Sequence, residues 1–159
     1  EAKTEYGPGA SATGTASVAV GDDAKAAAVN SSAYGLKSKA LSSHSVAIGN
    51  EASVGKGDPD PESSQNGIAI GHGANVTVNP ATATPGITDK SGGIAIGHNA
   101  TTKDINTVAL GTGTVGQGAQ AVAIGVMRIR TGIIRSLSGI IPGFVLLTVL
   151  HLVMKHGQV

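Results

Sequence analysis

The chain has 159 residues, with no cysteine or tryptophan, two tyrosines, one phenylalanine and 24 glycines. So few large aromatic side chains argue against a conventional globular core, and the lack of cysteine excludes a disulfide scaffold and thiolate metal sites. Residues 1–125 contain seven lysines and ten acidic residues, a net charge of −3, which argues against nucleic acid as a partner.

From its beginning the chain repeats one short motif, which is clearest at residues 45–49, Ser-Val-Ala-Ile-Gly. Further copies lie at residues 17–21, 67–71, 93–97, 107–111 and 121–125, with weaker ones at 4–7 and 32–35. The closing glycines are separated by 14, 14, 14, 22, 26, 14 and 14 residues. A fixed period interrupted by two insertions is typical of a solenoid.

Within each copy, two large apolar residues flank an alanine, as Val46 and Ile48 flank Ala47. Side chains alternate between the two faces of a strand, and β-branched residues favour strands, so each copy is predicted to be a short strand that ends at its glycine. We expect the large apolar residues to point into the coil and the alanines to point outward. The expected inner columns include Val18, Val20, Val46, Ile48, Ile68, Ile70, Ile94 and Ile96.

A second, weaker alternation follows each glycine and predicts a second strand with small residues inside and polar residues outside. One coil is therefore two short strands and two turns, and the chain has about eight coils. The expected outward positions of the second strand include Ser11, Lys25, Lys39, Ser53, Asn75 and Thr101.

The alanines of the first strand form a column that is too small and too apolar for an ordinary solvated face. We therefore expect this column to pack against other copies of the chain in a closed homo-oligomer. The expected packing residues are Ala19, Ala33, Ala47, Ala69, Ala95, Ala109 and Ala123.

The repeated pattern Ser/Thr-Val-Ala-Ile-Gly-x-x-Ala-x-Ala at 14-residue spacing resembles the YadA-like head domain of the trimeric autotransporter adhesins, over about residues 4–125. The resemblance implies an all-β fold, a left-handed parallel β-roll of 14-residue coils, and an intertwined homotrimer. It also implies a passenger domain on the bacterial outer membrane and cell surface. Contact with a membrane is expected only through parts of a full-length protein outside this sequence.

Residues 1–125 are thus expected to form the head, with insertions near residues 56–65 and 79–91. Four of the six prolines lie in the insertions, which are candidates for a binding feature or a brace against a neighbouring subunit. Residues 126–159 form a basic and apolar tail whose origin is left open, with foreign sequence as the first interpretation and a membrane-interacting or partner-packing segment as the second.

The function predicted is that of a non-enzymatic adhesin head that attaches to host extracellular-matrix or cell-surface proteins. The alternative is a structural spacer that displays another binding domain, and an ice-binding or acyltransferase-like solenoid fits less well. The candidate ligand-binding residues are Lys25, Lys39, Ser53, Asn75, Asp58, Asp60 and Lys90.

No catalytic, cofactor or metal site is expected. Residues 111–116 spell Gly-x-Gly-x-x-Gly, but no helix pattern or downstream acid follows, as a dinucleotide site requires. His72 and His98 occupy equivalent places after a repeat glycine. We expect them to be solvated turn residues, and a cluster of imidazoles that binds an anion or a metal is the alternative.

Overall fold

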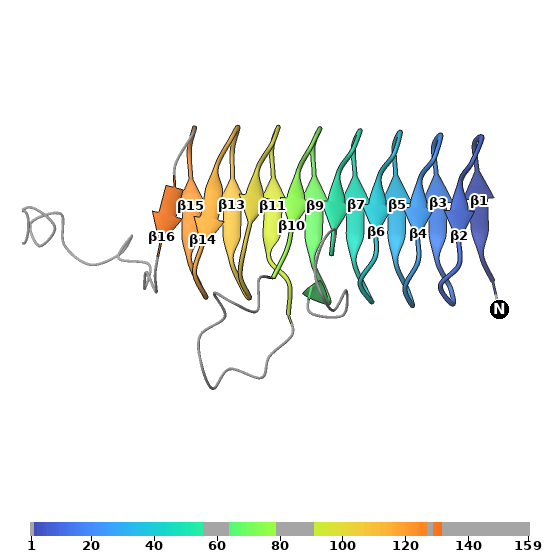
Figure 1. The fold of residues 1–159 in the computed structure, drawn as a ribbon, viewed down its shortest axis with the longest axis horizontal. Helices are drawn as coiled ribbons and strands as arrows, with labels where there is room; N and C mark the ends of the chain where they lie inside the picture. Colours follow the sequence, from blue (N-terminus) through green and yellow to red (C-terminus); the bar gives the residue numbers. More distant parts are fainter. Residues whose placement is uncertain (1, 56–63, 79–90, 127–128, 132–159) are drawn as a thin grey trace, which may run out of the picture.

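The computed structural model describes residues 2–55, 64–78, 91–126 and 129–131. These residues form an all-β rod, in which two parallel sheets run along the long axis and the chain alternates between them (Figure 1). Each sheet has eight strands, and the predicted all-β parallel roll is confirmed. Among the described residues, no helix is present that is long and apolar enough to cross a membrane.

The first sheet, sheet A, consists of the odd-numbered strands, each three residues long. They are β1 (Thr4–Tyr6), β3 (Val18–Val20), β5 (Ser32–Tyr34), β7 (Val46–Ile48), β9 (Ile68–Ile70), β11 (Ile94–Ile96), β13 (Val108–Leu110) and β15 (Val122–Ile124). Each strand from β3 to β13 pairs in parallel with the strand one coil before and one coil after it, and β1 and β15 are the two edges of the sheet. The sheet therefore follows the repeated motif copy by copy.

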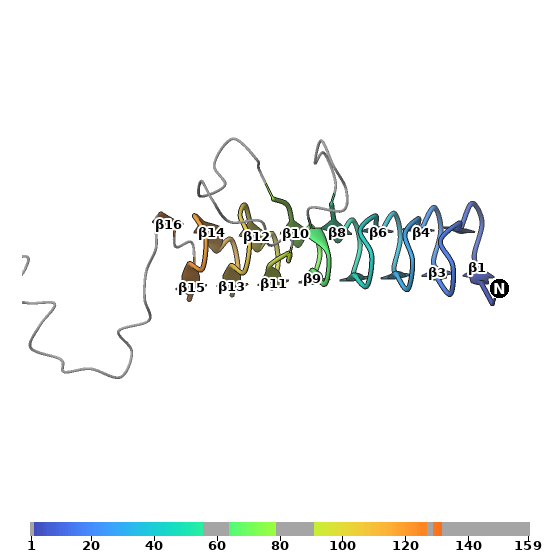
Figure 2. The ribbon, with the colours of Figure 1, turned by 90° about the horizontal axis from the view of Figure 1, so that it is seen from below.

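The even-numbered strands make up sheet B, and six of them are only two residues long. They are β2 (Ser11–Ala12), β4 (Lys25–Ala26), β6 (Lys39–Ala40), β8 (Ser53–Val54), β10 (Asn75–Val76), β12 (Thr101–Thr102), β14 (Val115–Gln117) and β16 (Ile129–Thr131). In Figure 2 the chain winds from one sheet to the other and back once per coil.

Equivalent residues of successive coils lie directly beside one another. Ala47 pairs with Ala33 on one side and with Ala69 on the other. The register continues across both insertions, because Val76 pairs with Val54 and with Thr102. Both insertions therefore leave the roll between a strand of sheet B and the next strand of sheet A without disturbing the stacking.

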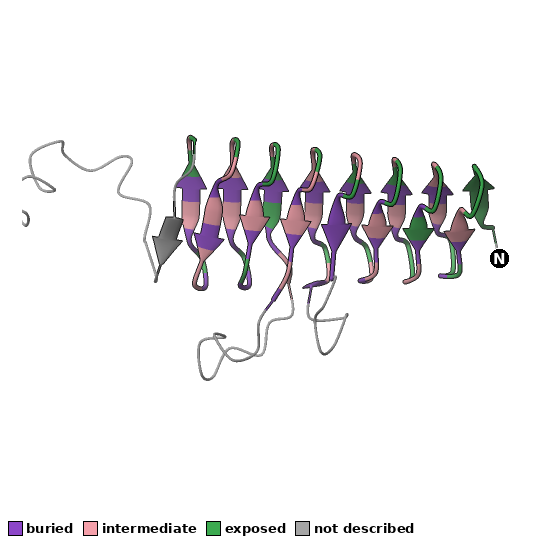
Figure 3. Cartoon of the chain, turned by 45° about the horizontal axis from the view of Figure 1, so that its top comes forward, coloured by how far each residue is buried: buried purple, intermediate pink, exposed green. Residues whose placement is uncertain are grey.

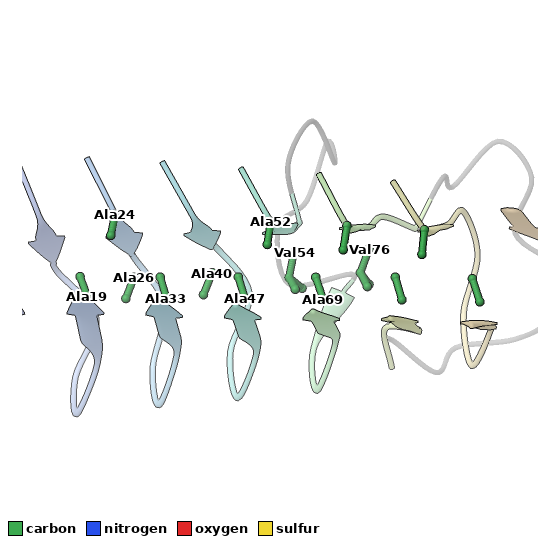
Figure 4. Close-up of a cluster of buried hydrophobic side chains, with 14 of the residues drawn as sticks. Ala19, Ala24, Ala26, Ala33, Ala40, Ala47, Ala52, Val54, Ala69 and Val76 are labelled. Atoms are coloured by element: carbon green, nitrogen blue, oxygen red, sulfur yellow. The ribbon is translucent and has the colours of Figure 1, made fainter. Parts of the chain in front are cut away.

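The orientation of the sheet A strands is opposite to the one expected from the sequence. The alanines at their centres point into the roll, toward the small residues of sheet B (Figure 4), and every central alanine of β3 to β15 has no exposed surface. The large apolar residues on either side of each alanine point outward. The prediction that this alanine column packs against other copies of the chain is wrong, because a side chain already buried within one chain has no surface to offer another.

The narrow coil explains this inversion. Two short strands and two tight turns bring the sheets so close that the space between them is filled largely by methyl groups, and sheet B contributes Ala26 and Ala40 to it. The largest apolar side chains buried there are Val54 and Val76. Interiors pack at high density, so larger side chains in facing positions would force the sheets apart.

The turns at the two ends of the sheet A strands are held differently. At the carboxyl end, Gly49 has a φ of +125°, and a Cβ placed there would lie 2.6 Å from the carbonyl oxygen of Gly71 in the next coil. At the amino end, the hydroxyl of buried Ser45 donates to the carbonyl oxygen of Ser42, three residues earlier. The first and last residues of the motif are therefore determined by turn geometry.

The roll extends beyond the predicted boundary at residue 125. Strand β16 pairs in parallel with β14, with Ile129 opposite Val115 and Thr131 opposite Gln117. The tail predicted at residues 126–159 therefore begins within the last coil, where Ile129 lies four residues after the repeat glycine, as Lys25 and Lys39 do. The repeated motif is absent from β16, but this strand still pairs in sheet B.

Candidate interaction surfaces

The outer face of sheet A carries a band of large apolar side chains on every strand from β3 to β15 except β5, where Ser32 and Tyr34 take the outward positions. In this single chain all of them are half-buried or exposed, and Ile48, Ile96 and Ile124 have 39%, 38% and 60% of their surface accessible. In Figure 3, half-buried and exposed residues alternate with buried ones along these strands. The band consists of Val18, Val20, Val46, Ile48, Ile68, Ile70, Ile94, Ile96, Val108, Leu110, Val122 and Ile124.

An exposed band of this kind is unusual for an isolated chain. Parallel sheets occur almost always with both faces covered, and long apolar patches on a protein surface mark sites of association. Sheet A is covered on its inner face by sheet B alone, and nothing in the described part of the chain covers its outer face. The residues that sequence reasoning had placed inside the coil are therefore the residues available for contact with other chains.

The outer face of sheet B is polar, as predicted. Lys25 is exposed, and Lys39 lies next to it in register and is half-buried. The following residue in this column, Ser53, is 3% exposed, and its hydroxyl donates to Oδ1 of Asn75 at 2.7 Å. Ser53 therefore has almost no surface for a ligand, and its expected place among the outward-facing ligand-binding residues is wrong.

The remaining candidate ligand-binding residues, Asp58, Asp60 and Lys90, lie outside the described residues. The structure does show how the segments after the two insertions are joined. Gln65 and Ser91 form a parallel β-bridge, and the amide of Gly92 donates to the carbonyl oxygen of Gln65 at 2.6 Å. The chain thus re-enters the roll at equivalent places on neighbouring coils after each insertion.

Comparison with known protein families gives matches along this rod. The YadA head domain repeat family matches residues 7–24, 12–38, 26–52 and 90–114. The chain carries a YadA head. Heads of this family are adhesin-type domains of trimeric autotransporters, exposed at the cell surface and not known as enzymes. A search of curated proteins finds no match to the chain.

One group in the head was missed by the sequence analysis. Asp104 lies in the turn between β12 and β13 and is fully buried. Its Oδ1 accepts a hydrogen bond from the amide of Ile105 at 2.8 Å, and its Oδ2 has no hydrogen-bond partner in the described part of the chain. Burial raises the pKa of the Asp104 carboxyl above its usual value, and the bond from Ile105 opposes this only in part.

Asp104 could have been singled out by its place in the repeat. The same place in the neighbouring coils is occupied by Val78 and Gly118, so an acid is an exception there. Thr102 in the preceding strand also has a buried hydroxyl without a hydrogen-bond partner. No group of three or more histidine or acidic side chains that could hold a metal ion is present among the residues described.

Proposed function

We propose that this head is the adhesive part of a bacterial surface protein and that it works as a homotrimer. The observation that carries the proposal is the contrast between the outer faces of the two sheets. The apolar outer face of sheet A packs against the two other chains, and the polar outer face of sheet B is left toward the surroundings. Family membership supports the number of three.

Host extracellular-matrix or cell-surface proteins are the proposed ligands, and the polar column of sheet B is their proposed contact surface. Lys25 and Lys39 lie side by side in this column, and Asn75 farther along it is half-buried. Contacts at these positions are individually weak, and three copies on one axis raise the overall affinity through avidity. The insertions with Asp58, Asp60 and Lys90 add a second proposed contact region.

The regular stacking of the rod favours a second candidate function. A roll whose register continues through eight coils is a stiff element, as a spacer between the cell and another binding domain requires. The two candidates differ in one property, because an adhesin head binds host material by itself and a spacer does not.

The test is binding of the full chain to immobilised basement-membrane matrix and to cultured epithelial cells. If the column of sheet B makes the contact, Lys25→Ala combined with Lys39→Ala lowers binding at least tenfold. The matched control is Lys37→Ala combined with Lys103→Ala, which removes the same charge from exposed turn positions and leaves binding within twofold.

The possible results separate the proposals. No binding by the unchanged protein contradicts the adhesin and supports the spacer. Equal loss in both double variants shows a general charge effect and contradicts a contact at Lys25 and Lys39. Binding that is lost only when the insertions are removed would place the contact on the insertions and contradict the role of the sheet B column.

A further inference from the structure

Two histidines on neighbouring coils lie face to face on the surface of the head. His72 directly follows Gly71, and His98 directly follows Gly97 one coil later. Their imidazole rings are stacked, with centroids 5.1 Å apart and planes inclined by 9°. Both side chains are exposed.

The backbone holds the two histidines in this arrangement. The amide of Gly97 donates to the carbonyl oxygen of Ile70 at 2.8 Å, and the amide of Asn99 donates to the carbonyl oxygen of His72 at 2.9 Å. These bonds lie on either side of the pair and fix the spacing of the two coils. The side chains are thus brought together by the fold and remain free to rotate into solvent.

We propose that His72 and His98 together bind one divalent late transition metal ion, such as Zn²⁺, Cu²⁺ or Ni²⁺, with water completing the coordination. Neutral imidazole is the commonest protein ligand for these ions. The carboxamide of Asn99 lies beside the pair, with Nδ2 3.4 Å from Nε2 of His98. Rotation of this carboxamide by half a turn would place its oxygen, in place of Nδ2, beside His98.

The two rings are close enough to form a chelate once the side chains reorient. Two nitrogens bound to one zinc ion at about 2.0–2.1 Å each lie at most about 4.2 Å apart. The rings, with centroids at 5.1 Å and nearly parallel planes, therefore need to approach by about 1 Å or more on the ligating edge and to tilt toward each other, because an imidazole nitrogen binds a metal ion in the plane of its ring. Exposed side chains on a fixed backbone can make this movement by a change in their side-chain torsions.

The stacking favours a cation over an anion as the ligand. An anion would be held by protonated imidazoles, and two positive charges stacked face to face repel each other. The nearest equivalent positions on the coils before and after the pair are Asn50 and Thr112, which carry no compensating negative charge. Neutral rings with free nitrogen lone pairs avoid this repulsion and are the form that binds metal.

Metal binding would also join two coils that are far apart in the sequence. His72 and His98 are 26 residues apart, and the longer insertion lies between them. A shared ion is held by both histidines only in the folded chain, so its binding free energy adds to the stability of the folded state. The head is therefore expected to unfold at a higher temperature when the ion is bound.

The experiment titrates the full chain with ZnCl₂ alone in a calorimeter, with the tail residues His151 and His156 both changed to Gln in every sample. The reference protein is expected to bind one ion per chain and to show a Tm raised by about 5 °C at saturation. His72→Gln and His98→Gln are each expected to weaken binding by about 100-fold, because chelation is lost. His44→Gln is the matched control, since His44 is an exposed turn histidine in another coil, and it leaves affinity and Tm shift unchanged.

A second readout distinguishes a shared ion from two separate ones. The electron paramagnetic resonance spectrum of bound Cu²⁺ is expected to show two coordinating nitrogens in the reference protein and one in either single variant. The proposal is overturned if the reference protein binds no Zn²⁺ below millimolar concentration. It is equally overturned if His44→Gln weakens binding as much as His72→Gln, or if the copper spectrum shows one nitrogen throughout.

Discussion

Contacts of single atoms determine which residues fit at each position of the repeat, and the glycine that closes each copy is the clearest example. Its place at a strand end follows from the sequence. Its second constraint, the approach of the next coil, could not be read from one sequence, because it depends on how closely the coils stack. At Gly49 a Cβ would lie 2.6 Å from the carbonyl oxygen and 2.7 Å from the carbonyl carbon of Gly71.

We predict that Gly49→Ala lowers the free energy of unfolding by about 3 kcal/mol, because backbone strain and overpacking act together. Urea unfolding followed by circular dichroism measures the change. Asn50→Ala, at the next position of the same turn, is the control and is expected to cost less than about 1 kcal/mol. Equal stability of Gly49→Ala and the unchanged protein would contradict the close approach of the coils.

Asp104 gives the head a pH dependence whose direction follows from its burial. Its pKa is raised in the folded state, so the folded protein holds this proton up to a higher pH than the unfolded chain does. The carboxyl therefore favours folding most when it is protonated, below its ordinary value of 3.8. That contribution is lost as the pH rises through the raised pKa.

Asp104→Asn is accordingly predicted to raise the Tm at pH 7, because a neutral amide replaces a buried carboxylate with an unpartnered oxygen. The gain is expected to disappear at pH 4, where Asp104 itself is increasingly protonated. Thermal unfolding at both pH values measures the change in Tm. Asp22→Asn, at an exposed turn position, is expected to leave the Tm unchanged at either pH. A variant that is less stable than the unchanged protein at pH 7 would show that the Asp104 carboxylate has a stabilising partner.

At the level of the strands, the sequence was sufficient to predict where the strands up to β15 lie and insufficient to predict which way they face. The period located the strands, and the alternation showed that Val46 and Ile48 share one face and Ala47 the other. Which face is inside depends on the width of the coil, and a single coil does not reveal its width. Burial of the larger residues was the wrong criterion, because an interior this narrow admits alanine in preference to isoleucine.

Local contacts also overrode the pattern in sheet B. Ser53 stands in the outward column and yet is buried, with its hydroxyl bonded to Asn75 on the neighbouring strand. At the end of the roll, β16 continues the sheet after the motif has disappeared. Backbone hydrogen bonds to an existing strand edge are enough to extend a sheet, so the loss of a side-chain motif did not mark the loss of structure.

The 14-residue period holds across the insertions once the inserted residues are subtracted. Deletion of residues 56–63 would join Gly55 to Ser64 and restore a 14-residue step between Gly49 and Gly71. Ser64, which is buried, would then occupy the place that Ser42 has one coil earlier. We predict that this variant folds with a Tm within about 4 °C of the unchanged protein, a change of about 1 kcal/mol or less.

The control deletes one residue more, 56–64, which leaves a 13-residue step and removes buried Ser64. This variant is expected to lose far more stability, because the turn is then too short to reach the next coil in register. Thermal unfolding compares the two deletions directly. Equal stability of both would show that the 14-residue step is not a requirement of the coil.

For the molecule as a whole, the outer faces of the two sheets differ in polarity. Sheet A has an alanine face toward sheet B and an apolar face that no described part of the chain covers, whereas the outer face of sheet B is polar. An assembly that covers sheet A leaves sheet B accessible along the rod. The interface and the adhesive surface would then lie on opposite sides of each coil, and changes to one can be made without altering the other.

The most direct test of this account is the solution mass of the full chain, measured by light scattering during size-exclusion chromatography. The unchanged protein is predicted to have a mass of three chains. Ile70→Lys combined with Ile96→Lys, on the outer face of sheet A, is predicted to lower this mass. On the same two coils, Asn75→Lys combined with Thr101→Lys adds the same charge to sheet B and keeps the mass of three chains. A stable monomer, or equal masses for the two double variants, would contradict the role of sheet A as the trimer interface.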